Sequence, residues 1–306
     1  MIARIRPYEP GDFPQVEELD HCVFPEYTGS PPWRAGWHFE APEKCAARYV
    51  SIDPSSGRVN GYGSVRHVGS RHYRANLMVH PSCRRFGIGG ALFSALWEQL
   101  AGPLDAAYLQ VRVRKDQDQG LAFARSRDFE YVHEMRGRLL DLANVDLHGL
   151  ESQAHRCDPD GVSISTLSEL RLKNSDADAQ IADVYVQSQT GWLDPDPYMI
   201  HNPPDEERRA STELVRNARP DRLHVALVNE RPVGVSGETM GTAVLPDYRR
   251  RGIAGALLAA RIAGLKREGV AVFFSSSAQP AFTRIYDRLG CQDWFSEIRF
   301  VKRVEC

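Results

Sequence analysis

The pattern of apolar and polar positions repeats along the chain. Two short segments, 3–8 (ARIRPY) and 162–167 (VSISTL), alternate with the period of a half-buried β-strand. Each segment opens a similar series: strand, polar helix, hairpin, helix, strand, helix and final strand. The ranges after the first strand are 11–22 and 176–190 for the polar helices, 48–68 and 223–237 for the hairpins, 106–113 and 270–277 for the strands after the motif, and 118–127 and 279–289 for the late helices. The chain therefore predicts two copies of one α/β unit.

A longer identity supports the repeat. Residues 79–92 read VHPSCRRFGIGGAL and residues 244–257 read VLPDYRRRGIAGAL, with nine of fourteen positions identical at an offset of 165. The segments that follow have apolar residues at i, i+3, i+4 and i+7, starting from Ile88 and Ile253. This spacing predicts one buried helix face in each copy.

Length and composition agree with two domains. The chain has 306 residues, and 42% are hydrophobic and 25% charged, as in globular proteins. The segment 143–161 is polar and contains a proline and two glycines, so it marks the boundary between copies. We expect domains at residues 1–150 and 160–306.

The net charge and the cysteine spacing argue against nucleic-acid binding and against a metal site. A net charge of −2 argues against a nucleic-acid partner, because phosphate binding needs a basic surface. The six cysteines form no CxxC pair and have no histidine cluster beside them, so we expect no metal site. The chain has no apolar run of about 20 residues and no signal-like start, so we expect no membrane association and a cytoplasmic location.

The repeated motif has the chemistry of an anion-binding loop. Gly87, Gly89, Gly252 and Ala254 carry little or no side chain, so the backbone there can approach a ligand closely. The first N–H groups of the following helix have no partner within the helix and suit a pyrophosphate. The motif lacks both the GxxxxGK[ST] and the G-x-G-x-x-G spacing of nucleotide-binding loops.

The pattern Arg-x-x-Gly-x-Gly/Ala, preceded by V-x-P, resembles the acyl-CoA loop of the GNAT N-acetyltransferase superfamily. The segment RIYDRLG at 284–290 is similar to the family's late-helix signature. The resemblance covers both copies. It implies an α/β (α+β) fold of two tandem GNAT domains, each a mixed, mostly antiparallel sheet flanked by helices.

The resemblance also implies acetyl-CoA as co-substrate and assigns residues to it. One backbone N–H, at Val79 or Val244, would polarise the thioester carbonyl. The residues expected to bind acetyl-CoA are Leu77, Met78, Val79, Arg84, Arg85, Phe86, Gly87, Ile88, Gly89 and Gly90 in the first copy, and Thr242, Ala243, Val244, Arg249, Arg250, Arg251, Gly252, Ile253, Ala254 and Gly255 in the second.

Two residues are candidates for catalysis in the second copy. Tyr286 occupies the position of the family's late-helix tyrosine and would donate a hydrogen bond to the leaving thiolate. Glu238, beside the fourth strand, is the candidate base. The first copy has Ala124 in the tyrosine position, and its candidate bases are His67, His72 and His80. We therefore favour the C-terminal copy as the active one, although the first copy has the more typical glycines.

The acceptor would bind, by analogy with the family, at the loops 25–37 and 191–199, which contain Trp33, Trp37, Trp192, Tyr198 and acidic residues. The leading hypothesis is an N-acetyltransferase that acts on the amine of a small molecule, as a monomer or homodimer. The alternative is a CoA-sensing or scaffold protein whose acetyltransferase folds are inactive.

Overall fold

The structure is a computed structural model that describes residues 4–24, 45–69, 71–189 and 204–304. It divides into two compact units. The N-terminal unit comprises Met1–His133 and Ile298–Cys306, and the C-terminal unit comprises Glu134–Glu297. Each unit is described by itself below.

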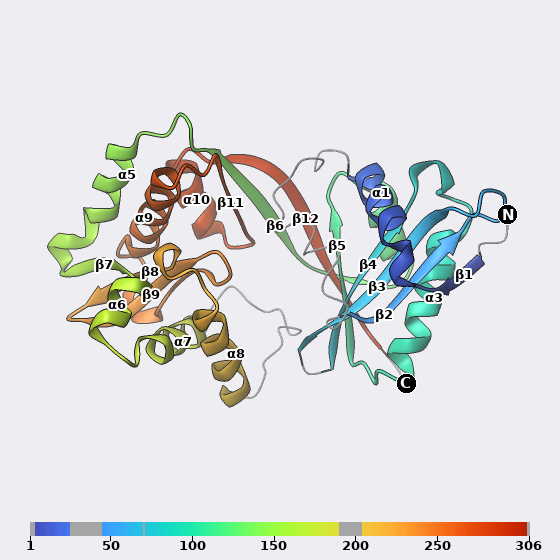
Figure 1. Ribbon diagram of the computed structural model, residues 1–306, viewed down its shortest axis with the longest axis horizontal. Helices are drawn as coiled ribbons and strands as arrows, with labels where there is room; N and C mark the ends of the chain where they lie inside the picture. The colour runs from blue at the N-terminus through green and yellow to red at the C-terminus, as the bar shows by residue number, and fades with distance from the viewer. Residues whose placement is uncertain (1–3, 25–44, 70, 190–203, 305–306) are drawn as a thin grey trace. The chain divides into compact units, whose positions relative to one another are not determined.

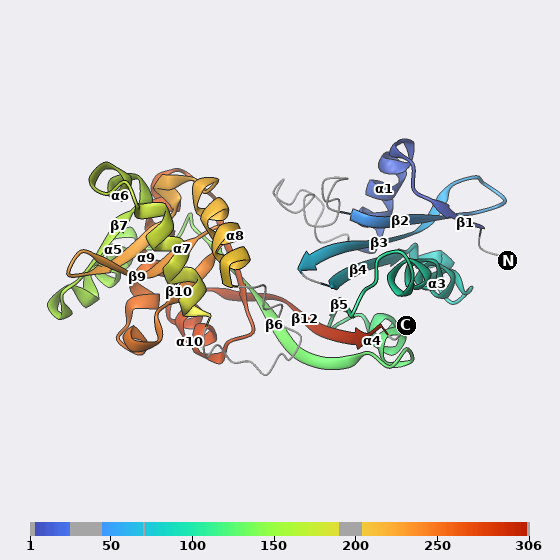
Figure 2. The ribbon, with the colours of Figure 1, turned by 90° about the horizontal axis from the view of Figure 1, so that it is seen from below.

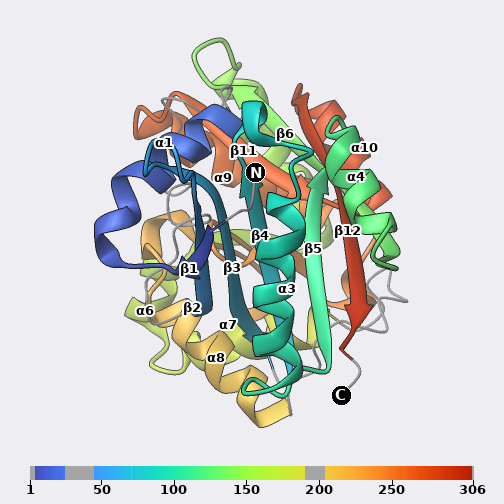
Figure 3. The ribbon, with the colours of Figure 1, turned by 90° about the vertical axis from the view of Figure 1, so that its right-hand side faces the viewer.

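The N-terminal unit is one sheet with helices on both faces. Its strands lie side by side in the order β1, β2, β3, β4, β5 and β12 (Figure 3). Their bounds are β1 Arg4–Pro7, β2 Cys45–Ile52, β3 Val59–Gly69, β4 His72–Val79, β5 Tyr108–Arg114 and β12 Gln292–Arg303. The pairs from β1 to β4 are antiparallel, and β4 pairs with β5 in parallel.

Strand alternation assigns the helices to opposite faces (Figure 2). Tyr62 and Met78 share a core with α1 (Phe13–Val23), whereas Val65 and Ala75 share a core with α3 (Ile88–Ala101). The late helix α4 (Asp118–Arg125) packs on the same side as α3, because its Leu121 belongs to the α3 core. The side of the sheet covered by α3 is therefore the one on which the anion loop opens.

The C-terminal unit has a similar series of elements, but its strands are divided between two sheets. Its helices are α5 Leu147–Ala154, α6 Leu167–Lys173, α7 Ala177–Ser188, α8 Pro204–Arg216, α9 Ile253–Arg267 and α10 Pro280–Arg288. Its own strands are β7 Val162–Thr166, β8 His224–Val228, β9 Arg231–Gly237, β10 Gly241–Val244 and β11 Val272–Ser277. The strands β7 to β10 form an antiparallel sheet in the order β10-β9-β8-β7, which does not include β11. Helix α5 lies along α9, and α6 and α7 lie on the other face of this sheet (Figure 1).

The strands β6 (Glu130–Asp141) and β12 each serve both units. In the C-terminal unit, β11 pairs antiparallel with β6, and β12 follows on the other side of β6. In the N-terminal unit, the last residues of β12 extend the sheet beside β5, and Val304 N–H donates to Ala107 O at 2.9 Å. The strand after each late helix thus joins the sheet of the other unit.

This exchange changes the division expected from the repeat. The predicted ranges 1–150 and 160–306 follow the sequence copies, whereas the compact units divide at 133/134 and 297/298. The physical reason is burial: Ile298, Phe300 and Val304 lie in the core formed with α3 and β5. The mixed, mostly antiparallel fold itself is confirmed.

Candidate functional site: two anion loops beside strand edges

The loop before α3 has the backbone that its glycine predicts. Strand β4 ends at Val79, a short turn covers Pro81–Cys83, and Gly87 is the N-cap of α3 with φ 83°. A Cβ added at Gly87 would meet nothing within 4 Å, so the space in front of the helix end is open. The N–H groups of the first helical turn face this space. Their partial positive charge suits a diphosphate.

The second loop repeats this backbone residue by residue. Gly252 is the N-cap of α9 with φ 84°, and the left-handed Arg250 (φ 64°) matches Arg85 (φ 69°). A side chain other than glycine is strained at such angles. The identity in sequence therefore corresponds to an identity in local conformation.

The first arginine of each motif fastens the loop. Arg84 Nε donates to Val79 O and Arg249 Nε donates to Val244 O, both at 3.2 Å. Arg249 Nη2 also donates to Ser188 O at 2.6 Å. The side chains of Arg84 and Arg249 thus bind the carbonyl groups at the ends of β4 and β10. The next arginines of each motif, Arg85, Arg250 and Arg251, are exposed to solvent.

The remaining predicted loop residues differ in what they present. Phe86 is exposed, and Ile88 and Ile253 are buried, so these isoleucines contribute only backbone groups. A Cβ at Gly89 would lie 3.3 Å from Phe123, and one at Gly90 would lie 3.2 Å from Arg127. These small residues therefore let α4 approach the first turn of α3.

The end of β4 offers free backbone groups to a slot. His80 N–H donates to Asn60 O of β3, so the N–H groups of Val79 and Leu77 point away from β3, toward β5. The parallel register with β5 runs only from His72–Tyr108 to Ala75–Val111, although β4 continues to Val79. The two strands therefore separate where these N–H groups emerge. The side chain of Met78 points to the face of the sheet that α1 covers, and it is buried there.

In the C-terminal unit, the slot lies along an unpaired strand edge. Leu245 N–H donates to Val233 O of β9, so the N–H groups of Val244 and Thr242 point away from β9. Within the described residues, β10 is the edge of its sheet and does not pair with β11. Ala243 faces the opposite side and lies in the core with α7.

Tyr286 lies in the core of the C-terminal unit. It is 3% exposed, and its hydroxyl is 2.7 Å from Ser275 Oγ of β11. Burial raises the pKa of Tyr286. Equivalent hydrogen bonds at the ends of the two late helices allow α4 and α10 to be aligned. Phe129 N–H donates to Ala124 O, and Cys291 N–H donates to Tyr286 O. The structural alignment therefore agrees that Ala124 corresponds to Tyr286.

Glu238 lies in the turn between β9 and β10, at the opposite end of β10 from the loop. Its Oε1 is 2.6 Å from Arg222 Nη1, and Arg222 also binds Glu268. The hydrogen bond to Glu268 contributes most to raising the pKa of Arg222, and the hydrogen bond to Glu238 raises it further. The carboxylate is thus held by an ion pair rather than directed at the loop.

The candidate histidines of the first copy are not brought together. His67 makes an edge contact with Tyr73, and His72 stacks on Tyr108 with ring centroids 4.9 Å apart. His80 Nδ1 is 2.8 Å from Ser82 Oγ. The predicted acceptor loops 25–37 and 191–199 lie outside the described residues.

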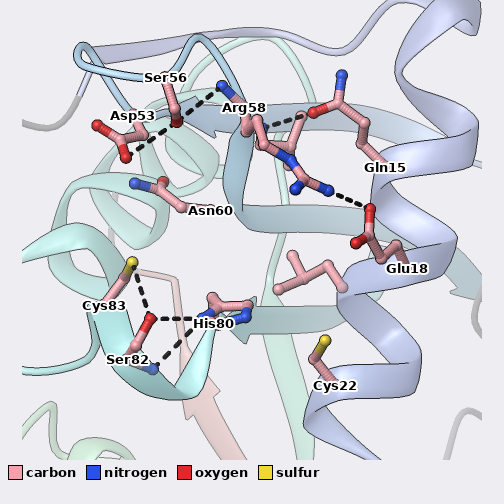
Figure 4. A pocket seen from close by; sticks show the side chains of 12 residues that line it. Gln15, Glu18, Cys22, Asp53, Ser56, Arg58, Asn60, His80, Ser82 and Cys83 are labelled. Carbon is pink, nitrogen blue, oxygen red and sulfur yellow. Dashed lines mark hydrogen bonds and ion pairs between the residues drawn. The ribbon is translucent and has the colours of Figure 1, made fainter.

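His80 lines a pocket of about 210 Å³ in the N-terminal unit (Figure 4). Gln15 and Glu18 of α1 lie across from His80 and Ser82, and the buried Asn60 also lines the pocket. The pocket lies on the β3 side of β4, whereas the N–H groups of Leu77 and Val79 point to β5. Strand β4 therefore separates this pocket from the slot.

The sequence interpretation missed a support beneath the second loop. The boundary segment folds into α5 and a short helix at His155–Asp160, and Cys157 Sγ donates to Arg251 O at 3.2 Å. A Cβ at Gly252 would lie 3.3 Å from this sulfur. The spacing of Leu147, Leu150 and Ala154 was the available signal, since it marks one face of a helix.

The structure thus combines a mixed α/β fold with two glycine-capped helix ends, each beside an open strand edge. Residues 13–129 match the family model described as Acetyltransferase (GNAT) family. The N-terminal part of the chain therefore contains a GNAT acetyltransferase domain.

Solved structures show the same fold over the whole chain. A GCN5-related N-acetyltransferase from Sphaerobacter thermophilus is 18% identical, with a TM-score of 0.76 over 99% of this chain and 96% of that one. A tandem GNAT protein from the clavulanic acid biosynthesis pathway is 17% identical, with a TM-score of 0.67 over 100% and 99%. A glucosamine N-acetyltransferase region of a fungal multi-domain β-N-acetylglucosaminidase is 16% identical, with a TM-score of 0.72 over 98% and 38%.

Comparison with curated proteins finds no significant sequence match. In the described part of the chain, no helix has the length and apolar character to cross a membrane. The cytoplasmic location stays a prediction.

Proposed function

We propose that the protein transfers an acetyl group from acetyl-CoA to the amine of a small molecule. The observation that carries the proposal is the doubled arrangement of an open, glycine-capped helix end beside outward N–H groups of Val79 and Val244. A diphosphate at the helix end would direct the pantetheine arm along the strand edge. The thioester would then lie within the slot.

The reaction needs a neutral amine, a polarised carbonyl and a stabilised leaving group. The amine nitrogen attacks the thioester carbon, the carbonyl oxygen becomes an oxyanion, and the C–S bond then breaks to release the CoA thiolate. Outward strand N–H groups supply fixed donors for that oxyanion. An alkyl amine with a pKa near 10 must also lose a proton, which costs about 4 kcal/mol at pH 7.

Tyr286 remains our candidate donor to the thiolate. A tyrosine hydroxyl both donates and accepts. Ser275 can donate to Tyr286 Oη, which leaves the Tyr286 proton for the sulfur. No equivalent hydroxyl exists at Ala124, so we propose that the C-terminal unit performs the transfer. Glu238 would have to leave Arg222 before it could act as the base.

A second candidate function is CoA sensing without transfer. Ala124 in the N-terminal unit and the Glu238–Arg222 ion pair in the C-terminal unit favour it. Sensing requires both loops to bind CoA and neither to release thiol from acetyl-CoA.

Paired substitutions at the two loops test the proposal. Gly87→Glu and Gly252→Glu each put a carboxylate and a strained backbone where the diphosphate would bind. Gly57→Glu and Gly269→Glu are matched controls, because both glycines also have positive φ and open space around the Cβ position. Calorimetry with acetyl-CoA and a thiol-release assay over a panel of amines are the measurements.

We expect the wild type and both controls to bind acetyl-CoA and release CoA. Gly252→Glu should abolish release, and Gly87→Glu should remove one binding event. Binding without release for any amine would favour CoA sensing. The absence of acetyl-CoA binding in the wild type would refute both candidates.

A further inference from the structure

The C-terminal unit has polar side chains where the N-terminal unit has an apolar core. Four pairs of equivalent positions show this change: Leu77 and Thr242, Leu96 and Arg261, Val111 and Ser275, Ala124 and Tyr286. In the N-terminal unit, Leu96 is fully buried and Ala124 is 2% exposed. The four replacements cluster on the α9 side of the slot.

The equivalences follow from the structure as well as from the sequence. The offset of 165 carries from the loops through α3 and α9, which places Arg261 opposite Leu96. Ala106 N–H donates to Leu100 O, and Val270 N–H donates to Leu265 O, so β5 and β11 align with Val111 opposite Ser275. The late helices align through the hydrogen bonds to Ala124 O and Tyr286 O.

Arg261 is a buried cation for which the described residues show no ion pair. It is 6% exposed, and its Nε has no hydrogen bond within the described part of the chain. Its guanidinium carbon lies 5.2 Å from the centre of the Phe273 ring. Burial lowers the pKa of Arg261, but a guanidinium remains charged near neutrality. Glu238 exerts an attraction on it, yet that carboxylate is bound to Arg222.

The Arg261 side chain extends from α9 to the Phe273 ring of β11. Its electrostatic neighbours include Tyr286 on α10 and Glu238 beside β10, and it contacts Phe273 on β11. In the N-terminal unit, β4 pairs with β5 from His72 to Ala75, at the level that corresponds to Arg261. In the C-terminal unit, the short turn before β10 takes the place of these β4 residues, so the described residues have no equivalent pairs there. Arg261 is eight residues beyond Ile253, about 12 Å along α9 from the loop.

We propose that Arg261 binds a carboxylate deep in the slot of the C-terminal unit. A guanidinium fork binds a carboxylate through two parallel hydrogen bonds. The carboxylate would belong either to the acyl group of a dicarboxylic CoA thioester or to the acceptor. This inference rests on the proposed function. Leu96 makes the N-terminal unit unsuited to such a charge.

The experiment isolates the C-terminal unit with Gly87→Glu. Calorimetry compares succinyl-CoA with butyryl-CoA, which has the same chain length and no terminal charge. We expect succinyl-CoA to bind at least tenfold more tightly. Arg261→Met should reduce the ratio to below twofold and leave the affinity for CoA itself unchanged. Arg261→Lys should retain part of the preference.

A second arm distinguishes the source of the carboxylate. Free succinate is added to the protein with CoA, and the melting temperature is measured. A stabilisation that Arg261→Met abolishes, together with equal affinities for the two thioesters, would assign the carboxylate to the acceptor. Equal affinities and no Arg261-dependent stabilisation would overturn the inference.

The two proposals fail separately. If CoA does not bind to Gly87→Glu, the proposed function of the C-terminal unit fails, while the melting measurement with succinate alone still tests Arg261. Without ligand, Arg261→Met should melt at the wild-type temperature or above, because it removes a buried charge that has no ion pair among the described residues. A strongly lowered melting temperature with unchanged ligand preference would assign Arg261 a structural role and refute the inference.

Discussion

Phe300 tests whether the last strand of the chain belongs to the first unit. Phe300 lies in β12, is 3% exposed, and packs in the core with α3 and β5. Truncation of a buried phenylalanine to alanine costs about 3–5 kcal/mol. A unit of this size has a free energy of unfolding of about 5–15 kcal/mol. Phe300→Ala should therefore remove a large part of the stability of the N-terminal unit.

The matched control is Phe273→Ala. Phe273 is 1% exposed in β11, within the core of the C-terminal unit. Hydrogen exchange read by mass spectrometry separates the two effects. We expect Phe300→Ala to speed exchange in β4 and β5, and Phe273→Ala to speed exchange in α9 and α10. Faster exchange confined to α9 and α10 in Phe300→Ala would refute the assignment of β12.

Three further predictions follow from buried polar groups. Burial lowers the pKa of His224 from 6.5 to about 4. Below pH 6.5 the unfolded state therefore binds a proton that the folded state does not, and the free energy of unfolding falls by about 3 kcal/mol between pH 6.5 and pH 4. Urea titrations should show this loss in the wild type and a smaller loss in His224→Asn. Tyr286→Phe should reduce the rate of thiol release at least tenfold with less than a twofold change in the Kd for CoA, and an unchanged rate would exclude Tyr286 as donor to the thiolate. Arg138 is buried and pairs with Asp287 at 2.6 Å and with Asp293 at 2.7 Å. In denaturant titrations, Asp293→Asn should lower the free energy of unfolding by less than about 1 kcal/mol, and Arg138→Ala should lower it by about 3 kcal/mol. Only Arg138→Ala leaves buried space and two acids without their partner.

The local structure could be predicted from the sequence where a few residues decide it. The positive φ of Gly87 and Gly252 follows from the glycine loops, and the tight turn at Asn229–Glu230, with φ values of 48° and 62°, follows from its position between two apolar runs. The strand at Val162–Thr166 and the late helix at Pro280–Arg288 lie close to their predicted ranges. These features depend on neighbours in sequence.

The exchange of β6 and β12 could not be predicted in this way. Both strands alternate similarly, and either would satisfy the edge of either sheet, so the choice depends on contacts such as Phe300 with α3 that no local pattern encodes. The buried position of Tyr286 against Ser275 likewise depends on how α10 packs on β11. Arg261 was hidden within an apolar helical stripe, where only comparison with Leu96 reveals the change.

The placement of β12 also affects the order of events during synthesis. The 164 residues from Glu134 to Glu297 separate the main part of the N-terminal unit from its final strand. At 5–20 residues per second, the ribosome needs roughly 8 to 30 s to make them. During that time the outer edge of β5 has no partner from β12, and such edges invite pairing with other chains. The half of the protein that emerges first is therefore the last to be completed, and it depends on protection until translation ends.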